Sequence, residues 1–233
     1  MIPKIIHYCW LSGDPYPPLI SECITSWKKH LPDYEFILWD TKKIDVNSNL
    51  WLKQAFEKRK YAFAADYIRF YALYNYGGIY LDADVEVIKS FNPLLSEKHF
   101  IGEEASGDIE AAVIGVEKGN FWIKECLDYY KNRSFIKEDG SFDMRPVPLL
   151  VYSKIKNKDI DIKPFYYFSP KDYNIGIIKK NAETYCIHHF DGKWIKKGFK
   201  YSIKRMIHKL LYYCLGRKGH NKFVHIIREF KIN

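Results

Sequence analysis

The sequence has no run of about 18 apolar residues, so we expect no membrane-spanning helix. It also lacks a Walker loop, a G-x-G-x-x-G turn and a Ser-His-Asp set. Its five cysteines are odd in number and form no C-x-x-C pair, which favours free thiols in a reducing compartment over disulfides or structural zinc. The opening MIPKIIHYCW lacks the charged segment and cleavage site of a signal peptide, so we expect none.

Acidic residues are almost missing from the end of the chain. Residues 193–233 contain 12 Lys and Arg against one acid, Glu229, whereas residues 1–192 contain 25 basic and 27 acidic residues. The formal net charge of +9 therefore comes from the tail, which argues against a nucleic-acid partner that covers the whole surface. With 233 residues, 47% of them hydrophobic, the chain can form one large domain, or one domain with a small appendage.

Strand and helix patterns alternate from the start of the sequence, which is typical of a layered α/β domain. A helical pattern without proline over residues 50–76 ends at Gly77-Gly78, as expected for a glycine cap. A short apolar strand over residues 79–81 then runs directly into Asp82-Ala83-Asp84. Other patterns predict strands over 2–10, 34–39 and 111–116 and helices over 20–30 and 120–130.

The two carboxylates after this strand are the sharpest candidate for chemistry. Two acidic side chains two residues apart at a strand end can point the same way and offer two oxygen ligands to a hard divalent cation. Asp82 and Asp84 meet this condition, but so short a motif also arises by chance. A second copy, Asp159-Ile160-Asp161, follows no buried strand and is flanked by lysines, so we expect it to lie on the surface.

The block YAFAADYIRFYALYNYGGIYLDADVEVI, residues 61–88, resembles the sugar-binding region of glycosyltransferase family 32. This family includes bacterial capsular and lipopolysaccharide transferases and yeast mannosyltransferases, and the block also looks like the glucosylating domains of large bacterial toxins. The segments IPKIIHYCWLSG, SWKKHLPDYEFILWD and HHFDGKW are similar to other parts of the family. The resemblance implies a GT-A catalytic domain, Rossmann-like with a mixed central sheet, over residues 1–195.

The catalytic residues that the resemblance implies are Asp66, Arg69 and Asp82. Asp66 and Arg69 are three residues apart on the expected helix and share a face, and the matching family pair grips sugar hydroxyls. A local salt bridge on an ordinary helix is the alternative. Asp82 resembles the residue that bridges sugar or ribose and metal, and Asp84 the direct metal ligand, with a solvated turn as the alternative.

Several further residues are implied to bind the donor. Trp10 follows the first strand, where family members use a Trp to stack on the nucleotide base, and a core Trp is the alternative. Lys193 and Trp194 would help hold the diphosphate, although the family often has Ser in place of Lys193. We expect His7 to be a buried, hydrogen-bonded histidine rather than a catalyst. The complete donor-binding set is Cys9, Trp10, Asp66, Arg69, Tyr80, Asp82, Lys193 and Trp194.

Two adjacent histidines, His188 and His189, lie in the segment that closes over the diphosphate in the family and in related metal-dependent transferases. Neighbouring side chains on an extended segment point to opposite faces, so we expect only one to join Asp82 and Asp84 at the metal. We favour His189, with a purely structural pair as the alternative. An imidazole nitrogen suits Mn²⁺ better than Mg²⁺, so the expected cofactor is Mn²⁺, or else Mg²⁺.

The tail over residues 196–233 has apolar residues at three- and four-residue steps, which predicts a basic amphipathic helix. Its lysines and arginines fall largely off the apolar face, as in a helix that lies on an anionic membrane surface. A terminal helix packed on the domain is the alternative, and RNA binding is less favoured because no stacking motif is present. The apolar residues are Phe199, Ile203, Met206, Ile207, Leu210, Leu211 and Cys214.

These features predict a metal-dependent retaining glycosyltransferase. It would move a hexose from a nucleoside diphosphate sugar, a UDP-sugar by preference, to a glycan or lipid-linked saccharide in surface polysaccharide synthesis. Acceptor contacts are expected near Glu103-Glu104 and residues 139–143, unless these acids are simply solvated. The tail predicts a location in the cytoplasm, at the inner face of the cytoplasmic membrane. The alternatives are a sugar nucleotidyltransferase, which should carry a triphosphate loop, and a non-catalytic membrane- or polyanion-binding protein.

Overall fold

The computed structural model describes residues 1–192 and 199–232, with side chains for 1–192 and 206–224. One sheet is built from β1 (Ile5–Cys9), β2 (Glu35–Trp39), β3 (Gly78–Leu81), β5 (His99–Glu103), β6 (Ile109–Val116) and β7 (Ile162–Lys163). These six strands lie in the order β2-β1-β3-β6-β5-β7. β1 runs parallel to β2 and β3, whereas β6 is antiparallel to β3 and β5. The predicted α/β fold with a mixed central sheet is therefore confirmed.

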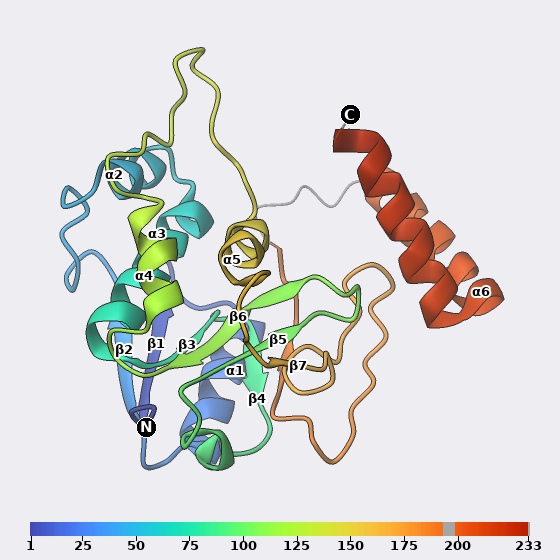
Figure 1. The fold of residues 1–233 in the computed structure, drawn as a ribbon, viewed down its shortest axis with the longest axis horizontal. Coiled ribbons are helices and arrows are strands. Elements are labelled where there is room, and N and C mark those ends of the chain that lie inside the picture. Colours follow the sequence, from blue (N-terminus) through green and yellow to red (C-terminus); the bar gives the residue numbers. More distant parts are fainter. Residues whose placement is uncertain (193–198, 233) are drawn as a thin grey trace.

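Helices cover both faces of this sheet (Figure 1). One face carries α1 (Pro18–His30) and a small antiparallel ladder of β4 (Val85–Val87) and β8 (Cys186–His188). The other face carries α2 (Leu50–Glu57), α3 (Tyr61–Tyr76), α4 (Phe121–Asp128) and α5 (Val147–Ile155). The short 3₁₀ helix η1 (Asn92–Leu94) follows β4.

The strand β3 separates two hydrophobic cores. Its side chains alternate, so Ile79 and Leu81 pack with Trp27 of α1, whereas Tyr80 packs with Phe70 and other residues of α3 on the opposite face. All four residues of β3 are buried. The chain leaves the sheet directly after this strand, which fixes the aspartates that follow at the end of a rigid element.

The helical pattern over residues 50–76 forms two helices, α2 and α3, separated by a break that the pattern did not indicate. The break lies at Lys58, Arg59 and Lys60, where Arg59 has a φ of 54°. The amide of Lys60 donates back to the carbonyl of Ala55 at 2.8 Å and closes α2. A non-glycine residue at positive φ is uncommon, and no glycine or proline marks this turn in the sequence.

Gly77 and Gly78 end α3 and begin β3, as expected. Gly77 has a φ of 68°, and its amide donates to the Leu73 carbonyl. Gly78 has a φ of 99°, and a Cβ at this position would lie 2.7 Å from the carbonyl oxygen of Ile5 on β1. Both glycines are therefore explained by backbone geometry, and neither is needed for phosphate binding.

The tail forms α6 (Phe199–Ile232), which is interrupted at Gly216, where φ is 66° and ψ is 177°. The helical tail is thus present as two segments rather than one. His208 and His220 join the two segments, with 3.0 Å between Nδ1 and Nε2, and both are buried. Among the described residues, no helix is long and apolar enough to cross a membrane.

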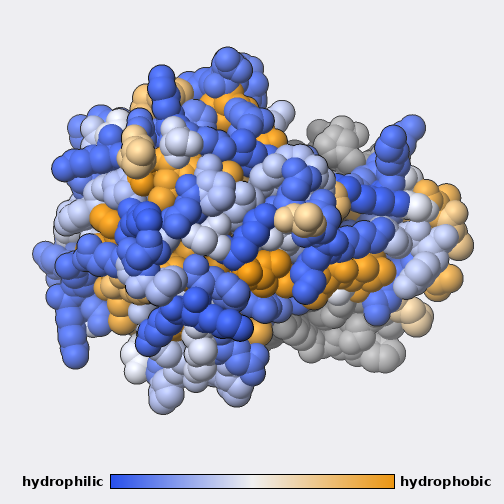
Figure 2. Space-filling model, turned by 90° about the horizontal axis from the view of Figure 1, so that it is seen from below, coloured by the Kyte–Doolittle hydropathy of each residue, from blue (hydrophilic) through white to orange (hydrophobic). Residues whose placement is uncertain are grey.

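One side of α6 contacts the domain and another is open to solvent. The side chains of Arg217 and Asn221 both donate to the carbonyl oxygen of Ala105, in the loop between β5 and β6. Hydrophobic surface remains on the part of the molecule formed by the tail, at the right of Figure 2. The exposed apolar residues of this region, called the apolar row below, are Met206, Ile207, Leu210, Tyr213 and Leu215.

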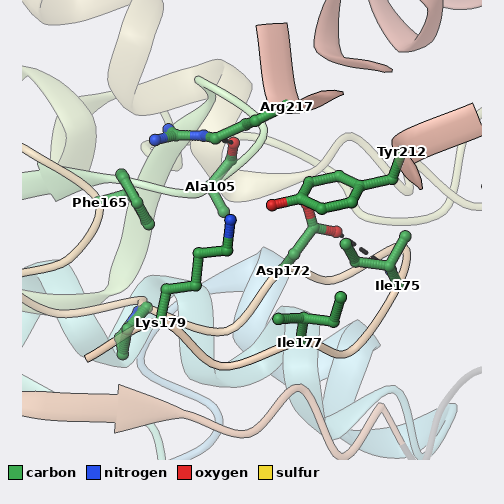
Figure 3. A pocket seen from close by; sticks show the side chains of 9 residues that line it. Ala105, Phe165, Asp172, Ile175, Ile177, Lys179, Tyr212 and Arg217 are labelled. Atoms are coloured by element: carbon green, nitrogen blue, oxygen red, sulfur yellow. Dashed lines mark hydrogen bonds between the residues drawn. The ribbon is translucent and has the colours of Figure 1, made fainter. Parts of the chain in front are cut away.

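A pocket lies where α6 meets the domain. Figure 3 shows the side chains of Lys179 and Tyr212 directed into it. The guanidinium of Arg217 lies 3.6 Å from the ring centre of Phe165 and so covers an apolar wall of the domain. These contacts support the alternative that the tail packs on the domain, although the apolar row is left uncovered by the described residues.

Candidate active site

The helix α3 and the end of β3 bring three charged residues together. Arg69 donates from Nη2 to Oδ1 of Asp82 at 2.9 Å, and its Nη1 lies 3.4 Å from Oδ1 of Asp66. Asp66 and Arg69 are buried, whereas the Asp82 side chain is 30% exposed. The helix spacing of three residues places Asp66 beside Arg69, as predicted, but only the contact between α3 and β3 places Asp82 there.

The ionisation of Asp66 is perturbed by this environment. Burial raises the pKa of its carboxyl group, Arg69 lowers it, and Asp82 raises it, with a resulting value of about 7. Because Asp66 lies next to a permanent cation, Arg69, and a second carboxylate, Asp82, a change in either charge shifts the protonation of Asp66. Such perturbed groups cluster at functional sites.

Tyr80 and Cys9 line the same place from two neighbouring strands. The guanidinium of Arg69 lies over the Tyr80 ring, 4.6 Å from its centre. Burial raises the pKa of the Cys9 thiol to about 12, while a hydrogen bond with Tyr80 and the charge of Arg69 oppose the rise. The thiol therefore stays protonated and is a neutral contact rather than a nucleophile.

Asp82, Asp84 and His188 form a cluster that fits a metal ion. Each offers one ligand atom, and the three atoms lie within 4.8 Å of one another. The register of β4 with β8 pairs Val85 with His188 and so places the imidazole beside Asp84. Nε2 of His188 is 3.5 Å from Oδ1 of Asp84. Two carboxylates and one imidazole are a donor set suited to a divalent cation.

Asp84 is fixed by the segment that follows β8. Its carbonyl accepts from the amide of His189 at 3.0 Å, and its Oδ2 accepts from the amide of Asp191 at 2.8 Å. Burial alone would raise the pKa of Asp84, but the charge and hydrogen bond of His188 and the Asp191 amide hold it well below its usual range. The carboxylate is thus charged and ready to bind a cation.

The preference for His189 as the metal ligand is corrected by this geometry. Nε2 of His189 lies 2.9 Å from Oε2 of Glu86, whose side chain is 40% exposed. The ring of His188, in contrast, faces Asp84. Neighbouring residues of an extended segment point to opposite sides, as expected, but the side that reaches the aspartates is decided by the pairing of β8 with β4.

Glu110 is a site residue that the sequence reasoning missed. It lies on β6, is 1% exposed, and its Oε2 is 3.1 Å from Nδ1 of His188. The signal was a single acid inside the apolar strand IEAAVIGV, because a buried charge is rare without a partner. Glu104 lies nearby, where burial and the charge of Glu110 raise its pKa to about 8 despite the opposing charge of His188.

Trp10 lies at the end of β1, in a position that leaves its ring half-buried. Its Nε1 donates to the carbonyl of Asp14 at 2.7 Å, and its ring packs edge-on against Tyr16 at 5.1 Å. The ring is thus held by the following loop rather than by the core. Lys193 and Trp194 lie outside the described residues.

The remaining candidates have structural explanations. His7 is buried and uses both ring nitrogens: Nε2 is hydrogen-bonded to the Gly77 carbonyl, and Nδ1 accepts from Trp39 Nε1. In the second D-x-D copy, Asp161 is 75% exposed and pairs with Lys163. Both expectations are confirmed. The acids of the loop over 139–143 make local hydrogen bonds. Asp139 accepts from the amide of Ser141 within the loop, and Asp143 accepts from Arg133.

Residues 17–101 match the family described as "Glycosyltransferase sugar-binding region containing DXD motif". This stretch contains Asp66, Arg69, Asp82 and Asp84 of the site. Residues 17–101 are therefore similar to the sugar-binding region of DXD glycosyltransferases. The resemblance found in the sequence is confirmed for this part of the chain.

Curated proteins are similar to part of this chain. Inositol phosphoceramide mannosyltransferase 3 of Schizosaccharomyces pombe is 31% identical over 130 residues, which are 54% of this chain and 36% of the relative. Mannosyl phosphorylinositol ceramide synthase CSH1 of Saccharomyces cerevisiae is 30% identical over 146 residues, which are 58% of this chain and 38% of the relative. The matched part of the chain spans little more than a third of the length of these relatives.

Solved structures show a more distant likeness. The PaToxG glycosyltransferase superposes with a TM-score of 0.47 at 22% identity, over 68% of this chain and 72% of that chain. The galactosyltransferase LgtC, solved with donor and acceptor sugar analogues, gives a TM-score of 0.39 at 14% identity, over 65% of this chain and 70% of that chain.

Proposed function

We propose that this chain is a metal-dependent retaining glycosyltransferase that moves a hexose from a nucleoside diphosphate sugar to a hydroxyl group of a lipid-linked or glycan acceptor. The proposal is carried by one observation: the Arg69–Asp82 hydrogen bond of 2.9 Å joins the Asp66–Arg69 pair to the Asp82–Asp84–His188 cluster. A nucleotide sugar has two matching ends, a diphosphate that needs cations and a sugar that needs hydrogen-bonding groups.

Asp82, Asp84 and His188 would hold the divalent ion. Their three ligand atoms lie within 4.8 Å of one another, and the mixture of two carboxylates with an imidazole favours Mn²⁺ over Mg²⁺. The bound ion would stabilise the negative charge that develops on the departing diphosphate. Asp84 would contribute a fixed, charged ligand because the backbone amide of Asp191 already orients it.

Arg69 and Asp66 would orient the sugar. Nε of Arg69 is buried and makes no hydrogen bond among the described residues, and Nη1 has only its 3.4 Å ion-pair contact with Asp66. A buried donor without a partner costs about 1–3 kcal/mol, and an oxygen of the nucleotide sugar would offset this cost. Asp66, Arg69 and Asp82 are the proposed catalytic residues; they supply orientation and charge, and no strong base is needed. Trp10, Cys9, Tyr80, Lys193 and Trp194 complete the proposed donor site.

The relatives bear on the acceptor. Their names describe mannosyl transfer and inositol phosphoceramide, a phosphorylated lipid. They support a lipid acceptor over the capsular and lipopolysaccharide acceptors of the bacterial members, and mannose as the first hexose to test. The resemblance favours a UDP-sugar as the donor, and sugars linked to other nucleoside diphosphates are the alternative.

A lipid acceptor requires the catalytic domain to approach a membrane surface. We assign residues 1–195 to this domain and residues 196–233 to a membrane-contacting tail at the inner face of the cytoplasmic membrane. The apolar row on α6 and the exposed lysines beside it suit an anionic lipid surface. Leu210→Glu should reduce sedimentation with phosphatidylserine vesicles, whereas Leu149→Glu, at an exposed leucine of α5, should not. Equal binding by both variants would remove the tail from this role.

The activity is tested by incubating the full chain with UDP-, GDP- and TDP-hexoses and Mn²⁺ and measuring the release of nucleoside diphosphate. Asp84→Asn should abolish the release, and Asp161→Asn, in the exposed second D-x-D copy, should leave it unchanged. Full activity of the Asp84 variant would contradict the proposal. Formation of pyrophosphate from a nucleoside triphosphate and a sugar phosphate would instead identify a nucleotidyltransferase.

A further inference from the structure

The buried carboxylate of Glu110 has two hydrogen-bond partners that fix its position. Its Oε1 accepts from the amide of Ala112 at 2.7 Å, on the same strand. Its Oε2 lies 3.1 Å from Nδ1 of His188, which is 78 residues further along the chain. All eight residues of β6 are buried, and Glu110 is the one acid on this otherwise apolar strand. Burial of a carboxylate costs free energy unless the carboxylate is paired and hydrogen-bonded.

We infer that Glu110 is a positioning residue for the metal site, which acts by orienting the imidazole of His188 toward Asp82 and Asp84. This inference rests on the function proposed above. Neutral imidazole carries one N–H and one lone pair, and the group bonded to the first nitrogen decides which nitrogen can bind a cation. In the neutral ring that binds a metal, a carboxylate that accepts from Nδ1 leaves the lone pair on Nε2. Nε2 is the atom that faces Asp84, at 3.5 Å.

The ring of His188 is held on a second side by Phe190. The two ring centres are 3.9 Å apart, with 36° between the planes. The β4–β8 ladder fixes the backbone of His188 opposite Val85. With its backbone, one ring face and Nδ1 all constrained, the imidazole has little freedom to turn away from Asp84. Glu110 supplies the constraint that also selects the nitrogen.

The chain contains a matched pair that serves as an internal control. His189 and Glu86 form the same kind of contact, at 2.9 Å between Nε2 and Oε2. This pair does not belong to the Asp82–Asp84–His188 cluster, and Glu86 is 40% exposed. Both pairs join a histidine of the same segment to a glutamate on another strand, so they separate a specific effect on the metal site from the general loss of a carboxylate.

The test is the affinity of the full chain for Mn²⁺, measured from the electron paramagnetic resonance signal of free Mn²⁺ without any sugar nucleotide. Glu110→Gln should weaken binding by about tenfold and Glu110→Ala by up to about a hundredfold, the range typical of carboxylates behind metal-bound histidines. Glu86→Gln should bind Mn²⁺ as the unmodified chain does. Circular dichroism shows which variants fold. If Glu110→Ala does not fold, Glu110→Gln still tests the inference, because glutamine keeps the volume of glutamate and an acceptor oxygen.

A second readout follows the imidazole itself. The Nδ1–H proton resonance of His188 should move upfield in Glu110→Gln, because the charged acceptor is lost, and should stay unchanged in Glu86→Gln. Unchanged Mn²⁺ affinity in folded Glu110→Gln would overturn the inference and leave the proposed function standing. Equal losses in Glu110→Gln and Glu86→Gln would also overturn it. No Mn²⁺ binding by the unmodified chain would overturn the metal site and this inference together.

Discussion

Arg69 donates a hydrogen bond of 2.9 Å from Nη2 to Oδ1 of Asp82, which follows it by 13 residues. This bond crosses from the middle of α3 to the first residue after β3. It couples a residue proposed to hold the sugar with a residue proposed to hold the metal. The two halves of the site are therefore one charged unit, and a change in one should be felt in the other.

Replacement of Arg69 by lysine should separate these two halves. A single ammonium cannot serve Asp66 and Asp82 together as a planar guanidinium does. We expect kcat/KM for nucleotide-sugar hydrolysis to fall by about 100-fold, which corresponds to about 2.7 kcal/mol. Arg133→Lys, at the Arg133–Asp143 pair, which shares no residue with the Asp66–Arg69–Asp82 group, should leave kcat/KM within about twofold. Comparable losses in the two variants would contradict the special position of Arg69.

The two adjacent histidines should differ in their effect on metal binding. His188→Ala removes the nitrogen that lies within 4.8 Å of both aspartate oxygens, so Mn²⁺ affinity should fall at least about tenfold. His189→Ala removes a contact with Glu86 and should change the affinity little. Isothermal titration calorimetry with MnCl₂ measures both. A larger loss of Mn²⁺ affinity in the His189 variant would show that His189, the residue favoured from the sequence, is the metal ligand.

The stability of the fold should fall in acid because of His7. Burial lowers the pKa of His7 from 6.5 to about 4, although its hydrogen bond to Gly77 opposes this. Between these two values the unfolded chain binds a proton that the folded chain does not, so acid favours unfolding. The contribution is complete above pH 6.5 and is lost as the pH falls toward 4, with a total of about 3 kcal/mol.

The physical cause is visible in the hydrogen bonds of the ring. Nδ1 of His7 accepts from Trp39 Nε1, so a proton on this nitrogen would face a donor. In His7→Gln, urea unfolding should give a free energy that depends less on pH between 4 and 6.5, while the pH dependence above 6.5 is unchanged. The same slope in both proteins would show that His7 is not the titrating group.

Alanine at Gly78 should destabilise the junction between α3 and β3. The added Cβ would lie 2.7 Å from the Ile5 carbonyl oxygen, and the φ of 99° is unfavourable for any residue with a side chain. We expect a loss of more than about 2 kcal/mol in the free energy of unfolding. Gly140→Ala, where φ is 78° but no atom lies within 4 Å, should cost only about 1 kcal/mol. Urea denaturation compares the two, and equal costs would show that the close approach to β1 is unimportant.

The sequence predicted the local parts of the fold and site because these depend on short spacings. Asp66 and Arg69 share a helix face three residues apart, and the apolar strand that leads into Asp82 separated the real D-x-D motif from the exposed copy at Asp161. The helix break at Arg59 escaped prediction, since a positive φ in a lysine- and arginine-rich turn carries no glycine or proline signal.

Long-range contacts decided the rest. Whether His188 or His189 reaches the aspartates depends on the register of β8 against β4, about 100 residues away in sequence, and a shift of one residue would exchange them. The partnership of Glu110 with His188 depends on the distance between two separate strands. The sequence by itself determined which residue types and short motifs are available. Only the tertiary structure decided which of them meet, because strand register and helix packing set distances that spacing along the chain cannot.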